Sequence, residues 1–134
     1  MNEPLTITIL GTPRTKKNNQ IPVTNKATGR TMILQSKAYR EYERDSIGQI
    51  AKTSAYGMKI DTPVNVRCLF YMPTRRVVDL SNLLSAISDV LVRGEVLADD
   101  NSRIIRGYDG SRVLYDKENP RTEVFISGES INET

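Results

Sequence analysis

The chain has 134 residues, of which 38% are hydrophobic and 26% charged, a balance typical of one globular domain with a single core. It has one cysteine and no histidine, which excludes an internal disulfide, multi-cysteine or histidine zinc sites, and catalysis by a histidine base. No apolar run approaches the roughly 20 residues that span a bilayer, and the N-terminus lacks the pattern of a secretory signal. We therefore expect a cytoplasmic protein that does not bind or span a membrane.

Positive charge is concentrated in the first third of the chain. The net charge is +3, yet residues 11–40 contain no acid, whereas residues 123–134 contain three acids and no base. The basic residues of the first segment are Arg14, Lys16, Lys17, Lys26, Arg30, Lys37 and Arg40. Such a segment suits a polyanionic partner such as DNA, because each neutralised phosphate releases counterions. The alternative is that these residues form a basic surface that contacts only solvent and has no polyanionic partner.

The first half of the chain predicts two strands and a helix. Residues 5–10 (LTITIL) alternate apolar and polar side chains, the period of a half-buried strand. A polar, basic stretch follows to about Arg30, and residues 31–34 predict a short strand. Ser36 stands where it can cap a helix that continues to about Thr53.

The second half predicts three strands and a second helix. Residues 63–72 (PVNVRCLFYM) are the clearest strand, and the helix extends from about residue 79 to residue 93, where Gly94 stops it. Further strands are expected at residues 101–108 and 123–126, followed by a frayed tail from about residue 128. This order predicts an α+β fold for residues 1–134 as a single domain, in which two helices cover one face of a mixed or antiparallel sheet.

Acidic residues lie at both ends of the second predicted helix. Its helical period puts Asp79 and Asn82 one turn apart at the buried edge of the N-terminus, where the helix dipole favours a carboxylate. Asp99 and Asp100 follow the helix at a loop-to-strand junction. Carboxylates without imidazole favour hard cations such as Mg²⁺ or Mn²⁺. A plain N-cap at Asp79 and a solvated loop at Asp99 and Asp100 remain the structural alternatives.

The segment from Arg75 to Asn101, RRVVDLSNLLSAISDVLVRGEVLADDN, resembles the signature region of the RusA-type Holliday junction resolvases. The pattern is a basic tract, an acid that opens a helix, a further acid inside that helix, and an Asp-Asp pair about twenty residues after the first acid. The stretches GTPRTKKNN at residues 11–19 and SKAYR at residues 36–40 resemble the first loop and first helix of that family. The resemblance touches most of the chain, but only the Arg75–Asn101 segment is specific.

The resemblance implies a Mg²⁺-dependent endonuclease, active as a homodimer, that cleaves four-way DNA junctions, with Mn²⁺ as a possible substitute. It assigns the catalytic and metal-binding roles to Asp79 and Asp100, with Asn82 as a further catalytic residue and Asp99 as a further ligand. Asp89 matches the acid inside the helix. The DNA-binding residues expected beside this site are Arg14, Lys16, Lys17, Arg75 and Arg76.

Two positions depart from the best-known members of that family. Ser81 stands where they carry a second aspartate, and Ser85 stands where they carry a lysine. Ser81 could still complete an oxygen shell, because Mg²⁺ normally keeps several waters. The first alternative to an active resolvase is therefore a catalytically impaired DNA-binding protein of the same fold. The second alternative is a basic structural protein, in which the acidic residues only cap helices and stabilise turns.

Overall fold

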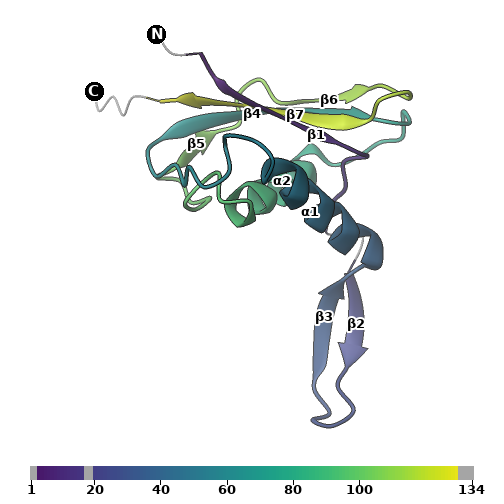
Figure 1. Cartoon of the computed structure of the whole chain (residues 1–134). Coiled ribbons are helices and arrows are strands. Elements are labelled where there is room, and N and C mark those ends of the chain that lie inside the picture. Colours follow the sequence, from purple (N-terminus) through teal and green to yellow (C-terminus); the bar gives the residue numbers. More distant parts are fainter. Residues whose placement is uncertain (1–2, 17–19, 130–134) are drawn as a thin grey trace.

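A computed structural model of the chain describes residues 3–16 and 20–129, and within them the backbone forms seven strands and two helices (Figure 1). In chain order these are β1 (Leu5–Leu10), β2 (Gln20–Thr24), β3 (Thr31–Gln35), α1 (Lys37–Ile50), β4 (Val64–Met72), α2 (Leu80–Arg93), β5 (Ile105–Gly107), β6 (Arg112–Tyr115) and β7 (Arg121–Gly128). The predicted α+β fold is confirmed. Lys17 and most of the expected frayed tail, residues 130–134, lie outside the described residues.

The main sheet is mixed, because its central strand β4 has antiparallel and parallel neighbours. β7 pairs antiparallel with both β1 and β4. On the other side of β4, β5 pairs parallel with its beginning and β6 with its end. The chain passes from β4 to β5 through α2, the usual way to connect two parallel strands.

One face of this sheet carries the core, and both helices lie on that face (Figure 1). Alternate residues of β4, from Val64 to Phe70, are buried there, as the period of a strand requires. Leu83, Ile87 and Leu91 of α2 pack into the same cluster. The two helices predicted on one face of the sheet are therefore confirmed.

The first helix begins and ends close to the predicted residues. Ser36 is its N-cap, and its hydroxyl accepts a hydrogen bond of 3.1 Å from the Tyr39 backbone N–H. The last helical residue is Ile50, three residues before the predicted end at Thr53. The predicted cap is confirmed.

The strand expected at residues 101–108 is mostly a turn, and this prediction is wrong for its first half. The backbone N–H groups of Ile104 and Ile105 both donate to the Asn101 carbonyl, at 3.0 and 2.9 Å. These local bonds compete with sheet pairing, so the strand begins only at Ile105, opposite Val64.

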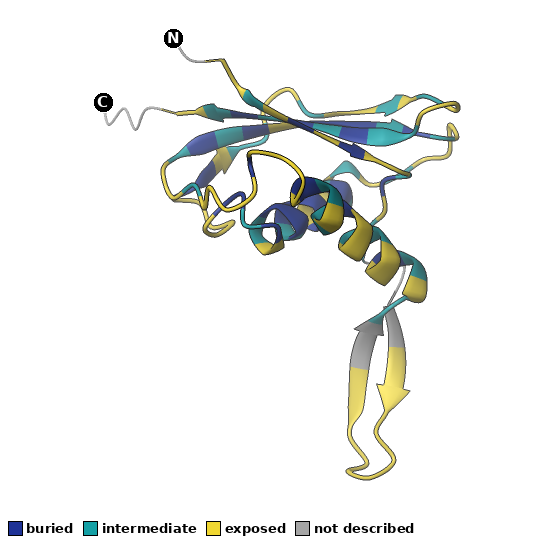
Figure 2. Ribbon diagram, viewed as in Figure 1, coloured by how far each residue is buried: buried dark blue, intermediate teal, exposed yellow. Residues whose placement is uncertain are grey.

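The strands β2 and β3 form a hairpin of their own, which stands away from the main sheet and both helices (Figure 1). Only β3 was predicted from the sequence. Residues 22–32 of this hairpin are all exposed (Figure 2). Among the described residues, no helix has both the length and the apolar character that a bilayer crossing demands.

Candidate active site

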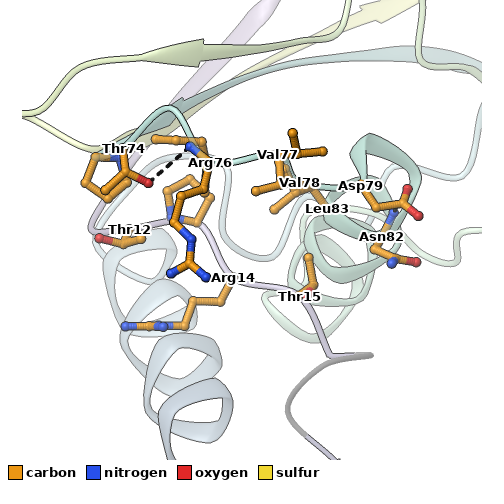
Figure 3. A pocket seen from close by; sticks show the side chains of 13 residues that line it. Thr12, Arg14, Thr15, Thr74, Arg76, Val77, Val78, Asp79, Asn82 and Leu83 are labelled. Carbon is orange, nitrogen blue, oxygen red and sulfur yellow. Dashed lines mark hydrogen bonds between the residues drawn. The ribbon is translucent and has the colours of Figure 1, made fainter.

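A cleft of about 510 Å³ lies at the connection between the end of β4 and the start of α2 (Figure 3). One wall comes from residues 12–15, which follow β1, and the other from residues 72–74 and 76–79, at the end of β4 and in its connection to α2. Asn82 and Leu83, in the first turn of α2, complete the lining. The cleft therefore brings together the basic first segment of the chain and the acid that precedes the second helix.

Asp79 is held in one position by the start of α2. It is the N-cap, with extended backbone angles (φ −92°, ψ 112°), and its Oδ1 accepts from the backbone N–H groups of Ser81 and Asn82 at 3.0 and 3.3 Å. The Ser81 hydroxyl donates to the same oxygen at 2.7 Å. Asp79 is thus the helix cap that the sequence offered as one alternative, and capping fixes the carboxylate at the edge of the cleft.

The expected burial of this site is wrong for Asp79. Asp79 and Ser81 are exposed, and only Asn82 is half-buried. The reason is that Asp79 has extended rather than helical backbone, so the helical period that placed it beside the core does not apply to it. The same extended backbone turns its side chain toward Ser81.

Two of the expected DNA-binding residues line the cleft. Figure 3 shows the guanidinium groups of Arg14 and Arg76 at one end and the side chains of Asp79 and Asn82 at the other. Arg75 does not line it, and its guanidinium instead stacks on the Tyr115 ring, 4.1 Å from the centroid. The cleft thus presents positive charge at one end and a fixed carboxylate at the other.

Lys16 contacts the helix rather than the cleft. Its Nζ donates to Oδ2 of Asp89 on α2, and the two side chains are 30% and 29% exposed. The lysine precedes β2 and is not at the tip of the hairpin, which comprises residues 25–30. Asp89, expected as a supporting acid, therefore ties the basic loop to α2.

Asp99 and Asp100 lie in the loop after α2 and do not line the cleft. Oδ1 of Asp99 accepts from the Asp100 backbone N–H at 2.7 Å, and Oδ2 accepts from Nδ2 of Asn101 at 3.0 Å. These two hydrogen bonds lower the pKa of the Asp99 carboxyl from its usual value. Both acids are exposed, so their carboxylates are accessible to a ligand from solvent.

A second group of polar side chains includes Tyr108. Burial raises the pKa of Tyr108, and the negative charges of Asp100 and Asp89 add to that effect. The hydroxyl is 2.7 Å from Oγ of Ser88, in the third turn of α2. At about 1.5 Å per residue, Ser88 is roughly 13 Å along the helix from Asp79. Tyr108 and Ser88 had no sequence signal beyond their places in a strand and a helix.

The oxygen donors of this region have the chemistry that Mg²⁺ prefers, since they are carboxylates and an amide. Their arrangement is less complete: among residues 3–16 and 20–129, no group of three or more acids, histidines or cysteines could hold a metal ion. Asp79 with Asn82 forms one pair of donors and Asp99 with Asp100 another. A metal would take its remaining ligands from water, which suits Mg²⁺ better than a cation that needs a closed protein cage.

A family model described as Endodeoxyribonuclease RusA matches residues 10–127 of the chain. The match covers the cleft, both helices and both pairs of acids. A search of curated proteins finds no match.

Proposed function

The chain belongs to the RusA family of endodeoxyribonucleases, and from this membership we propose that it resolves four-way (Holliday) DNA junctions by Mg²⁺-dependent hydrolysis of phosphodiester bonds. The membership establishes a hydrolase that acts on DNA. The observation that supports the finer proposal is the cleft, which is lined by a fixed carboxylate at Asp79 and by two arginines, Arg14 and Arg76. Mn²⁺ has similar ligand preferences and is expected to substitute for Mg²⁺.

The residues proposed to hold the metal are Asp79 and Asp100, with Asn82 and Asp99 as further oxygen donors, and in this structure the two acids belong to separate pairs of donors. When bound, Mg²⁺ would supply positive charge to the scissile phosphate and make a nearby water more acidic. Asp79 is suited to this role because three donors already fix its Oδ1. A carboxylate that is held before the metal arrives loses little conformational freedom on binding.

The positive residues of the cleft would bind and orient the DNA backbone. Arg14 and Arg76 come from opposite walls, so a phosphate between them could be contacted from two sides. A guanidinium can also stabilise the negative charge that develops on the phosphate during cleavage. In the best-known family members a lysine stands at position 85, and in this chain Ser85 has no positive charge to offer. Lys16 is less suited to this task, because Asp89 already neutralises it.

A two-fold symmetric substrate suits a symmetric enzyme. We propose a homodimer, because two copies of one site related by a two-fold axis can cut two strands of a junction at matched points. Junction shape and phosphate contacts would then set the preference rather than base edges. We place this activity in the cytoplasm.

The competing function is a DNA-binding protein of the same fold with weakened catalysis. It is favoured by two facts: no group of three acids forms among the described residues, and serines stand at positions 81 and 85. Both functions share the basic cleft, so binding alone does not separate them.

Cleavage of a labelled synthetic four-way junction, with Mg²⁺ and with EDTA, separates the two functions. An active resolvase yields two nicked duplexes with Mg²⁺ and only a bound complex with EDTA. A bound complex without cleavage at any Mg²⁺ or Mn²⁺ concentration supports the competing function. Absence of binding to the junction contradicts both.

A further inference from the structure

We propose that the β2–β3 hairpin is a DNA-binding arm that grips a duplex outside the cleft through Lys26 and Arg30 at its tip. This proposal rests on the proposed function, since it assumes that DNA is the substrate. It adds a second contact surface, separate from the residues assigned to metal binding and cleavage.

The hairpin contributes nothing visible to the core. It pairs only with itself, and none of its described residues joins the hydrophobic cluster. Val23 and Met32, opposite each other in the register, are 38% and 55% exposed. An isolated two-stranded hairpin is marginally stable in water, so a projecting one is best explained by a partner that covers it.

The tip of the arm is an ordered turn. The Asn25 backbone N–H donates to the Arg30 carbonyl, and the Gly29 N–H donates to the Asn25 carbonyl, both at 2.7 Å. Oδ1 of Asn25 also accepts from the backbone N–H of Ala27 at 2.8 Å. Gly29 has a φ of +72°, which favours glycine. Because the turn is closed internally, Lys26 and Arg30 are displayed from a preformed support, and less conformational freedom is lost on binding.

Charge identifies the partner as a polyanion. Lys26 and Arg30 are the only charged residues of the arm, both are exposed, and residues 11–40 contain no acid. The arm of a second copy of this chain would not attract the tip, because it carries the same two positive charges and no negative charge. DNA offers phosphates along its whole length.

The dimensions of the arm also fit a duplex. Five residues per strand, at about 3.4 Å each, give roughly 17 Å of reach. That length equals about five base pairs of rise, so the tip would contact phosphates about half a helical turn from the arm's base. The major groove, about 12 Å wide, admits a two-stranded ribbon. In the sequence, β2 begins six residues after Arg14, which lines the cleft, so a DNA strand bound in the cleft would be expected to pass the base of the arm.

The test compares three variants with the wild-type protein in EDTA, where no cleavage occurs. The first is Lys26→Ala with Arg30→Ala. The second replaces residues 25–30 with Asn-Gly, the two-residue turn that keeps a hairpin closed. The control is Lys52→Ala with Lys117→Ala, which removes the same charge from exposed positions outside the arm. Fluorescence anisotropy of a labelled junction between 50 and 200 mM salt gives the affinity and its salt dependence.

Both arm variants should show a slope of log affinity against log salt that is shallower by about 1.8 for each protomer whose arm contacts the DNA, or 0.9 for each lost phosphate contact, while the control keeps the wild-type slope. Thermal unfolding should be unchanged, because the arm lies outside the core. If the wild type binds and cleaves but the arm variants keep its slope, the arm proposal is wrong and the proposed function stands. If the variants instead change the oligomeric state in light scattering, the arm joins subunits and the proposal is also wrong. A wild type that binds no junction overturns both.

Discussion

Lys16 and Asp89 form an ion pair that joins the basic loop after β1 to the middle of α2. Arg14 and Thr15, which line the cleft, lie immediately before this lysine. The pair therefore fixes the end of the cleft wall formed by residues 12–15. The opposite wall ends in Asp79. Neither side chain lines the cleft itself, and we infer that the pair positions the loop.

A double-mutant cycle measures this link. Lys16→Met, Asp89→Asn and the double variant should give a coupling free energy of about 0.5–1 kcal/mol in urea unfolding, the range of a partly exposed pair. Asp89→Asn should also tighten junction binding, because it leaves Lys16 positive and removes a negative charge. A coupling of zero, with unchanged binding, would mean that the pair does not hold the loop in solution.

Asp79 is a helix cap and a proposed metal ligand, and two substitutions separate these roles. Asparagine caps helices as well as aspartate does, so Asp79→Asn should unfold at the same urea concentration as the wild type. It removes the ligand charge, so Mg²⁺-dependent cleavage should fall at least about a hundred-fold while junction binding persists. Asp79→Ala should lose cleavage and, in addition, about 1 kcal/mol of stability.

Asp100→Asn tests the second acid without a capping role. The side chain is exposed, so the variant should keep wild-type stability and junction binding and lose cleavage as Asp79→Asn does. Near-normal turnover in either asparagine variant would remove that residue from the proposed site.

The single thiol offers a test of the core. Cys68 is fully buried in β4, and burial raises the pKa of its thiol to about 12. At pH 8 only about one molecule in ten thousand would carry the reactive thiolate. Ellman's reagent should therefore react with Cys68 only in urea, whereas a thiol introduced by Ser54→Cys, at an exposed position, should react at once. Fast reaction of the wild type in native buffer would contradict the packing of β4.

The parts of the fold that follow from hydrophobic period were predictable. The helix α2 and the strand β4 have strong periods, and both were found within one residue of their predicted starts. The strand β2 was missed because Pro22 and a polar surround argue against a strand. It forms because β2 pairs only with β3 and its other side is a free edge, where a proline without an N–H is tolerated.

The candidate site was predictable as a set of residues but not as an arrangement. The family pattern singled out Asp79 and Asn82, which do share a cleft with Arg14. The pairing of Lys16 with Asp89 links positions 73 residues apart, and nothing in the local sequence specifies such a contact. The position of Asp100 likewise depends on how the loop after α2 folds, which period and propensity do not determine.

Ser81 is the position at which the proposed metal shell can be tested most directly. Its Oγ is 2.7 Å from Oδ1 of Asp79, although Ser81 is already helical. An aspartate at this position would therefore set a second carboxylate beside the first. Two adjacent negative charges repel each other, partly offset by the helix dipole, and a divalent cation would relieve that repulsion. We expect Ser81→Asp to lower the Mg²⁺ concentration for half-maximal cleavage by roughly a factor of ten, equivalent to about 1.4 kcal/mol.

The matched control is Ser85→Asp, which adds the same charge one turn later on α2, at another exposed position. Because Ser85 lies one helical turn further from the N-cap Asp79 than Ser81 does, its aspartate variant should leave the Mg²⁺ dependence nearer that of the wild type. Thermal unfolding supplies a reading independent of cleavage: added Mg²⁺ should raise the Tm of Ser81→Asp more than that of wild type or Ser85→Asp, because a ligand that binds the folded state stabilises it. Equal Mg²⁺ responses in all three proteins would exclude position 81 from the metal shell and leave Asn82 or Asp99 to complete it.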